Sequence, residues 1–111
     1  MAKFVTKRND TKPIEATLQR RDRTSGAFVP ADLTGGSVRF LMRRLIDDAA
    51  VVAALATILD APNGSVSYAF APSETAVAGE YRGEFELTQG GVVETFPAGS
   101  YIPIVIVEDL G

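Results

Sequence analysis

The fold class is indicated most clearly by Thr75-Ala76-Val77-Ala78-Gly79-Glu80-Tyr81-Arg82-Gly83-Glu84-Phe85-Glu86-Leu87. From Tyr81 to Leu87, apolar residues and a glycine occupy every second position, and charged residues occupy the positions between them. This alternation is typical of an antiparallel strand with one face in a core and the other in water. A tyrosine that opens a late strand after a glycine-containing corner also suits the tyrosine corner of Greek-key sandwiches, in which the phenol bonds to upstream backbone. The stretch therefore predicts an all-β sandwich.

Composition predicts one globular domain over residues 1–111. The chain is 46% hydrophobic and 23% charged, which is typical of a soluble domain with a single core. Cysteine is absent, so no disulfide framework is expected. No apolar run reaches the roughly 18 residues of a membrane span, and Met1-Ala2-Lys3-Phe4 lacks the apolar block of a signal peptide. We expect a protein made in a cytoplasm and not inserted in a membrane.

Short apolar runs separated by turn residues predict strands along the whole chain. Residues 21–36 have the composition of a long loop, with a short paired segment around residues 27–29. Pro103 cannot donate a ladder hydrogen bond, so the last strand is expected at a sheet edge or with a bulge. The expected strands cover about residues 4–5, 14–19, 38–43, 54–59, 65–70, 79–87, 92–96 and 101–107.

Residues 44–59 are ambiguous between helix and strand. Their alanines and leucines favour a helix, whereas Val51, Val52 and Ile58 favour a strand, and an aspartate at 47 or 48 could cap a helix. The choice stays open for residues 47–56. The following residues 60–64 contain Asn-Gly, which suits a tight turn, and a hairpin there favours a strand over residues 54–59.

The charges are distributed unevenly along the chain. Ten of the eleven cations and four of the fourteen acids lie in residues 1–44, which gives +6 there, −9 for residues 45–111 and −3 in all. One interpretation is cross-strand salt bridging in a sandwich that interleaves early and late strands. A second is a dipolar module that docks head to tail or onto an oppositely charged partner. Nucleic-acid binding is disfavoured by the acidic total and the lack of aromatics among the arginines.

The sequence predicts no catalytic, cofactor-binding or metal site. It contains neither histidine nor cysteine, so it has no Ser-His-Asp or Cys-His arrangement and no typical zinc site. Glu84 and Glu86 could be read as a carboxylate pair, but glutamates on an exposed strand face are usually only solvated. Asp47-Asp48 and Glu108-Asp109 lack the regular spacing of a calcium loop.

Two regions are candidates for contact with a partner. One is the basic segment near residue 20 with an aromatic side chain in a polar loop, and the other is the edge of the last strand. The candidate interface residues are Arg20, Arg21, Arg23, Phe28, Tyr101, Ile102, Ile104 and Val105.

Several segments stand in an order that is typical of one protein family. They are Asn9-Asp10-Thr11, Asp32-Leu33-Thr34-Gly35, Val38-Arg39-Phe40-Leu41-Met42, Gly64-Ser65-Val66-Ser67-Tyr68, Ala78-Gly79-Glu80-Tyr81-Arg82-Gly83-Glu84-Phe85 and Glu94-Thr95-Phe96-Pro97. Over roughly residues 4–107 the chain resembles the immunoglobulin-like N-terminal domain of tailed-phage baseplate upper proteins and its small stand-alone relatives encoded among phage structural genes.

The resemblance implies an immunoglobulin-like antiparallel β-sandwich of about seven or eight strands. It also implies an attachment module that anchors a larger appendage and oligomerises, without catalytic residues. The chain stops at Gly111, without the helical stalk and receptor-binding domain of the long members, which leaves adaptor, joint and surface-decoration roles open.

The expected function is therefore that of a non-enzymatic virion module, made in the host cytoplasm. It would mediate protein attachment as a baseplate or tail adaptor or as a capsid decoration. Its partners would be other virion proteins and copies of itself, with no nucleic acid and no membrane. One alternative is a module on the virion that binds a surface glycan or the host cell. A hydrolase would instead need a concave pocket with converging carboxylates.

Overall fold

The computed structural model describes residues 2–109, and nearly all of its regular structure is strand. The elements are β1 (Phe4–Lys7), β2 (Ile14–Thr17), β3 (Gln19–Arg21), β4 (Phe28–Pro30), β5 (Ser37–Arg44), β6 (Ala50–Leu55), β7 (Thr57–Asp60), β8 (Ser65–Tyr68), the 3-10 helix η1 (Pro72–Thr75), β9 (Gly79–Gln89), β10 (Val92–Phe96) and β11 (Ile102–Val107). The all-β prediction is confirmed. The strands outnumber the predicted seven or eight because two expected strands are each interrupted once and the paired segment near residue 28 forms a hairpin.

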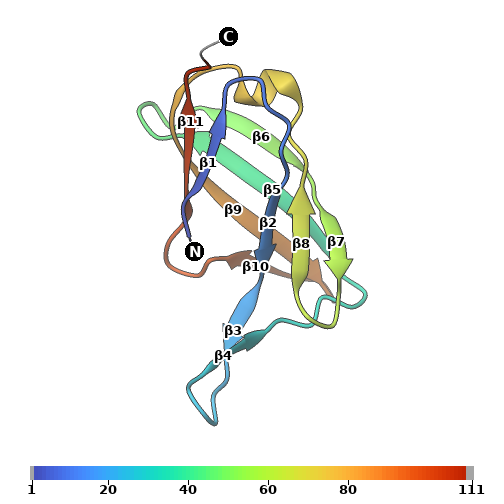
Figure 1. Cartoon of the computed structure of the whole chain (residues 1–111). Coiled ribbons are helices and arrows are strands. Elements are labelled where there is room, and N and C mark those ends of the chain that lie inside the picture. The colour runs from blue at the N-terminus through green and yellow to red at the C-terminus, as the bar shows by residue number, and fades with distance from the viewer. Residues whose placement is uncertain (1, 110–111) are drawn as a thin grey trace.

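The strands form two facing layers and a separate hairpin (Figure 1). The larger sheet has the order β1-β11-β9-β5-β6, with β10 paired to β9 beyond the end of β11. The smaller sheet has the order β2-β8-β7, and β3 pairs only with β4. All pairs are antiparallel except β1 with β11, which run parallel. The arrangement is a sandwich-like domain with one core between the two sheets.

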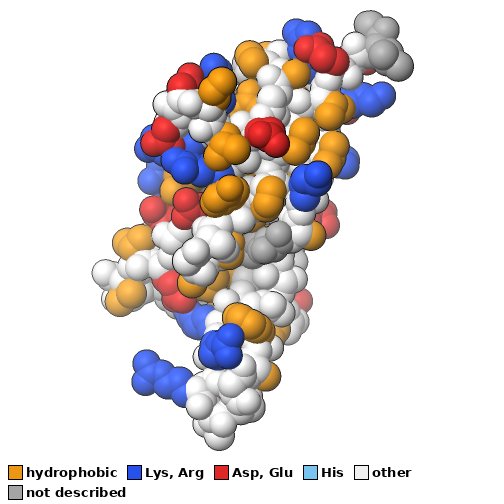
Figure 2. All heavy atoms as spheres, turned by 90° about the vertical axis from the view of Figure 1, so that its left-hand side faces the viewer, with side chains coloured by type: hydrophobic (Ala, Val, Ile, Leu, Met, Phe, Trp, Pro, Cys, Tyr) orange, Lys and Arg blue, Asp and Glu red, His pale blue; other side chains and the backbone are white. Residues whose placement is uncertain are grey.

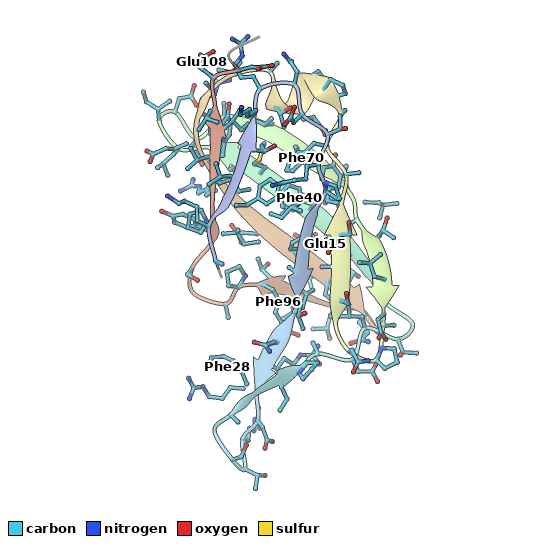
Figure 3. The ribbon with its side chains drawn as sticks, in the orientation of Figure 1. Glu15, Phe28, Phe40, Phe70, Phe96 and Glu108 are labelled. Atoms are coloured by element: carbon cyan, nitrogen blue, oxygen red, sulfur yellow. The ribbon has the colours of Figure 1, made fainter. Side chains whose placement is uncertain are left out.

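The core is centred on Phe40 of β5. Its ring lies 5.0 Å from Tyr68, 5.1 Å from Phe85 and 5.7 Å from Phe70, measured between ring centroids. Figure 3 shows Phe40 and Phe70 between the sheets. Because aromatic pairs in this distance range add to the free energy of burial, the contact between the sheets is concentrated at these rings.

Strand β9 has the two faces that its alternation predicts. Tyr81, Phe85 and Leu87 are buried, whereas the charged residues between them are half-buried. A Cβ added to Gly83 would lie 2.7 Å from Ile104 Cδ1 and 3.2 Å from the Phe40 ring, so a side chain there would require these core residues to shift. The Tyr81 hydroxyl donates to the Val77 carbonyl oxygen at 2.6 Å, and the predicted tyrosine-corner contact is thereby confirmed.

The ambiguous segment is strand, and it passes from one sheet to the other. Residues Ala50–Leu55 form β6 of the larger sheet, and Thr57–Asp60 form β7 of the smaller sheet. Between them, the Ala56 N–H donates to the Val38 carbonyl oxygen at 2.8 Å. The expected strand over residues 54–59 is confirmed in type, although it is interrupted at this crossing.

The expected position of the last strand at a sheet edge is wrong. β11 lies inside the larger sheet, between β1 and β9, and its pairing shows no bulge. Pro103 pairs with Arg82 of β9, and the ladder with β1 starts only at Ile104. The missing N–H of the proline therefore lies just outside the β1 ladder, which explains how an interior strand accommodates it.

Candidate interaction surface

A two-stranded hairpin, which we call the arm (residues 19–30), projects beyond the sandwich (Figure 1). The molecule is accordingly elongated, with principal extents of 49 × 24 × 22 Å. The predicted paired segment around residues 27–29 is confirmed as β4, which pairs with β3.

The root of the arm is anchored by backbone hydrogen bonds. The Leu18 N–H donates to the Gly64 carbonyl at 2.8 Å, and the Ala31 N–H donates to the Leu18 carbonyl at 2.8 Å. Gly64 has φ +70, and a Cβ there would lie 2.6 Å from the Leu18 oxygen. Only glycine allows the turn after β7 to approach the arm this closely.

The tip of the arm is ordered by Asp22. Its carboxylate accepts hydrogen bonds from the Ser25 hydroxyl at 2.8 Å and from the Ser25 N–H at 3.1 Å. Backbone bonds join Asp22 N to Ala27 O at 2.7 Å and Gly26 N to Asp22 O at 2.8 Å. The Ser25 hydroxyl and N–H lower the pKa of Asp22 because they stabilise its charged form. The tip therefore keeps its geometry, and with it the position of the neighbouring arginines.

Arg21, Arg23 and Phe28 are exposed on the arm. The Arg21 guanidinium lies 4.9 Å from the centroid of the Phe28 ring, and its Nη1 donates to the Gly26 carbonyl at 3.3 Å. Phe28 is 62% exposed. Within residues 2–109, neither arginine forms a salt bridge. The arm thus presents an aromatic ring and two cations to solvent.

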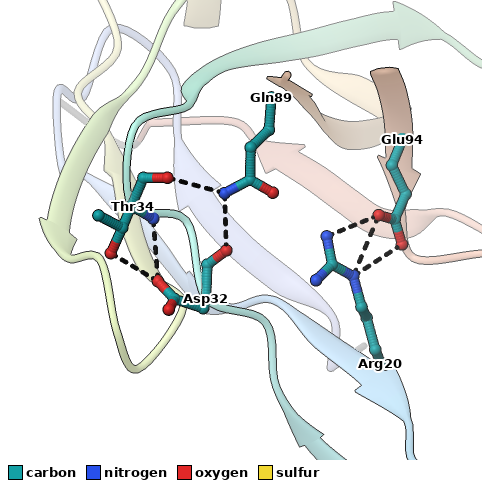
Figure 4. A network of polar contacts seen from close by, with 5 residues as sticks. All are labelled: Arg20, Asp32, Thr34, Gln89 and Glu94. Atoms are coloured by element: carbon teal, nitrogen blue, oxygen red, sulfur yellow. Dashed lines mark hydrogen bonds and ion pairs between the residues drawn. The ribbon is translucent and has the colours of Figure 1, made fainter. Parts of the chain in front are cut away.

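Arg20 and Gln89 tie the base of the arm to the sandwich (Figure 4). The Arg20 guanidinium donates to both carboxylate oxygens of Glu94 on β10, at 2.8 to 3.2 Å. The Gln89 amide donates to the carbonyls of Asp32 at 3.0 Å and Thr34 at 2.9 Å. The first contact joins β3 to β10, and the second joins the end of β9 to the segment that follows the arm.

A groove of about 780 Å³ lies between the arm and the β10–β11 connection. Figure 3 places Phe96 at the end of the sandwich and Phe28 on the arm below it. Figure 2 shows basic and hydrophobic side chains together on the projecting end. The lining residues are Thr17, Gln19, Arg20, Arg21, Arg23, Phe28, Glu94, Phe96, Pro97, Ala98 and Ser100.

The structure brings together half of the predicted contact residues. The four from the first candidate region, Arg20, Arg21, Arg23 and Phe28, all line the groove. In the second candidate region, Tyr101 is exposed and Val105 is half-buried, and neither lines the groove.

The other two residues of the second region belong to the core. Ile102 is 2% exposed and Ile104 is 1% exposed, because β11 is an interior strand whose alternate side chains point inward. They are therefore not surface contacts.

Sequence reasoning did not assign Glu94, Phe96 or Pro97 to the contact surface. Glu94 and Phe96 share a strand face and precede a proline, but that local pattern does not reveal that the arm lies opposite.

The ion pairs favour cross-strand bridging as the meaning of the uneven charge. Among the six salt bridges within residues 2–109, five join an arginine of residues 1–44 to an acid beyond residue 44, and two of these five, Arg43–Asp48 and Arg44–Asp47, are local to one turn. Arg39 and Glu86, for example, are directly opposite each other on β5 and β9, with 3.7 Å between Nη1 and Oε1. Half of the ten cations in residues 1–44 are thus used in salt bridges, and Arg21 and Arg23 are the arginines of residues 2–109 that form none.

Four of the six acids considered as metal or catalytic candidates, Asp47, Asp48, Glu86 and Glu108, form salt bridges. Asp48 pairs with Arg43 and Arg82, Asp47 pairs with Arg44, and Glu108 pairs with Arg8. Over residues 2–109 there is no cluster of three or more side chains able to hold a metal ion. None of the helical structure in that part of the chain is long and apolar enough to cross a membrane.

Together, the sandwich and its projecting arm define a β-sandwich module with an accessible groove beside the arm. The chain belongs to the family of BppU N-terminal domains, the N-terminal domains of phage baseplate upper proteins, whose family model matches residues 3–96. It is thus a domain of a phage baseplate structural family.

A similar solved structure is the N-terminal domain of phage TP901-1 ORF48. The two have a TM-score of 0.60 and 16% sequence identity, and the match covers 96% of this chain and 84% of that chain. This likeness concerns the fold. A search of curated proteins found no match.

Proposed function

We propose that this chain is a non-enzymatic module that attaches virion proteins to one another through the arm and its groove. The observation that carries the proposal is the gathering of Arg21, Arg23 and Phe28 on one projecting hairpin beside one groove. Aromatic and arginine side chains are the residue types that contribute most to binding between proteins once a partner covers them.

The chemistry of the groove supports binding rather than catalysis. Its one carboxylate, Glu94, is held by Arg20 in a bidentate ion pair. A general acid or base needs a titratable group that can reach a substrate proton. Here the lining is a set of cations, apolar walls and hydroxyl or amide groups, which suits recognition of another polypeptide.

Attachment in a particle does not require a tight single contact. A groove of this size accommodates a short segment, and repeated copies on a symmetric particle raise the overall strength because they engage together. We therefore expect modest affinity for the isolated module. We place it in the baseplate or tail, as an adaptor between other virion proteins, with copies of itself as neighbours.

The test is quantitative mass spectrometry of purified particles, combined with light scattering of the isolated protein. We expect the chain in the particle at a fixed ratio to a tail or baseplate protein. The Phe28→Ala variant should be present in assembled particles at a level at least about threefold lower than that of the unmodified chain. Leu55→Ala, which removes a 72% exposed side chain on β6, is the matched control and should incorporate normally.

Absence of the chain from purified particles would refute the proposed function. Equal incorporation of both variants would place the attachment surface elsewhere. Light scattering gives the oligomeric state of the isolated protein. A monomer would mean that the symmetric arrangement of copies arises only in the particle, whereas a closed ring would mean that the copies associate on their own.

A further inference from the structure

The groove holds positive charge that the fold does not neutralise. Four charged side chains line it: Arg20, Arg21, Arg23 and Glu94. Arg20 and Glu94 neutralise each other at 2.8 Å. Arg21 and Arg23 have no salt bridge within the described part of the chain, so the groove has a net excess of two cations beside an apolar surface.

The apolar part of the groove faces these cations. Phe96 is 2% exposed and belongs to the core, so it forms a firm base at the end of the sandwich. Pro97 and Ala98 continue the wall, and Phe28 lies across from them on the arm. A ligand that fits this lining needs an apolar side chain and at least one carboxylate or similar anion within reach of the arginines.

The strand next to the groove has an unpaired edge. Within residues 2–109, β10 pairs only with β9. Gln89 and Val92 flank the two-residue turn Gly90-Gly91, and in such hairpins the flanking residues form a hydrogen-bonded pair. Hydrogen-bonded pairs alternate along an antiparallel ladder, so Glu94 and Phe96, like Val92, direct their backbone groups toward β9. The N–H and C=O groups of Val93 and Thr95 therefore point to the free edge. An extended segment can add to the sheet there.

We propose that the groove binds an extended acidic segment of a partner virion protein, which adds as a strand to the edge of β10. A carboxylate of the segment pairs with Arg21 or Arg23, and an apolar side chain packs between Phe28 and Pro97. The inference rests on the proposed function and names the chemistry of the partner. Charge complementarity favours an acidic occupant, and the bonded arm tip provides a preformed site.

We take a different protein as the occupant because several acids that a second copy could offer are already paired within the molecule; Glu15, Glu80 and Glu84 form no salt bridge within residues 2–109, so a second copy is an outcome of the test. The acids at the turn between β5 and β6, Asp47 and Asp48, are already paired with arginines of the same molecule. The same holds for Glu86 and Glu108. A nucleic acid fits less well because Phe28, Phe96, Pro97 and Ala98 give the groove an apolar part and the chain has a net charge of −3.

The test uses the full chain and defined probes. The first probe is an acetylated octapeptide of alternating glutamate and leucine, and its controls are the same peptide with glutamine or lysine in place of glutamate. A single-stranded oligonucleotide and the purified chain itself are the other probes. Binding is followed by titration and by ¹H–¹⁵N NMR. We expect shifts confined to residues 19–30 and 92–100, and affinity at least about tenfold higher for the glutamate peptide than for the lysine peptide.

Variants separate the parts of the proposal. The double variant Arg21→Glu, Arg23→Glu should lower the affinity for the glutamate peptide at least about tenfold. The control variant Lys7→Glu, Lys12→Glu makes the same charge change on another surface and should leave this affinity unchanged. Thr95→Pro removes one N–H from the free edge but none from the β9 ladder, and it should also weaken binding. Thermal unfolding shows that each variant is folded. A peptide methylated on alternate backbone nitrogens should bind poorly if strand addition is correct.

The contradicting outcomes are distinct. Binding of no probe, equal binding of the lysine peptide, preference for the oligonucleotide, or NMR shifts on another surface would overturn the acidic-segment proposal. Self-association through the arm would replace the partner protein with a second copy. If the chain is present in particles while these results are negative, the proposed attachment function stands and only this inference fails.

Discussion

Arg20 of the arm and Glu94 of β10 lie 74 residues apart in sequence and form a bidentate ion pair across the base of the groove. The Arg20 Nε lies 3.1 and 3.2 Å from the two carboxylate oxygens, and Nη2 lies 2.8 Å from Oε1. Since β3 is bonded only to β4, this pair is one of the few side-chain links that hold the arm against the sandwich. The arm is therefore positioned by charge as well as by its backbone root.

A double-mutant cycle with Arg20→Ala and Glu94→Ala should give a coupling free energy of about 0.5–1 kcal/mol in urea unfolding. Because its geometry is bidentate, this pair should lie at the upper end of the coupling free energies of partly exposed ion pairs. The Arg39–Glu86 pair, with 3.7 Å between its atoms, is the control and should couple by less than about 0.5 kcal/mol. A larger coupling for the control pair would show that geometry does not decide the contribution.

Gly64→Ala should destabilise the fold by at least about 3 kcal/mol, because the methyl group meets the Leu18 oxygen at 2.6 Å and the residue has φ +70. Gly35→Ala is the matched control. Its φ is +78, but no atom lies within 4 Å of the added Cβ, so about 1–2 kcal/mol of backbone strain is expected. Equal losses in chemical denaturation would mean that the close approach at the root of the arm does not contribute.

Tyr81→Phe should cost about 1–2 kcal/mol of unfolding free energy, because it leaves the Val77 carbonyl without its 2.6 Å donor. Tyr101→Phe removes a hydroxyl from a residue that is 40% exposed and should change stability by less than about 0.5 kcal/mol. The two variants are compared by urea unfolding. Indistinguishable values would argue against a structural role for the tyrosine corner.

Stability should fall in alkaline solution through Tyr68. Burial and the Glu74 carboxylate, to which the hydroxyl donates at 2.8 Å, raise the pKa of Tyr68 to about 12 from 10.0. Because the folded-state pKa is raised, the contribution of neutral Tyr68 to the free energy of unfolding is complete below pH 10. This contribution is lost between pH 10 and about 12, by up to about 1.4 kcal/mol per pH unit. Tyr68→Phe should be less stable at pH 8 and should lose less stability across this window. Parallel curves for the two proteins would contradict this assignment.

Local sequence patterns predicted the elements but not all of their neighbours. The alternation from Tyr81 to Leu87 identified β9 and its core face because a strand sorts its side chains by position alone. The tyrosine corner was predictable for the same reason, since its two partners are four residues apart. The interior position of β11 was not, because the pairing of Ile104 with Phe4 depends on a strand at the other end of the chain.

The candidate surface was predictable in composition only. The arginines and Phe28 stand out in a polar loop, but nothing local shows that residues 19–30 project as a hairpin. Glu94 and Phe96 complete the groove from β10, and their approach to the arm is set by how β9 and β3 are placed in three dimensions. Contacts of such long sequence separation carry no local signature.

The most direct test of the account is a cryo-electron microscopy reconstruction of the purified particle that resolves side chains. The account predicts that the arm is buried against another protein, with Phe28 covered and the groove between Arg21 and Pro97 occupied by its neighbour. A reconstruction in which the arm extends into solvent, while a different face of the sandwich makes every contact, would contradict it.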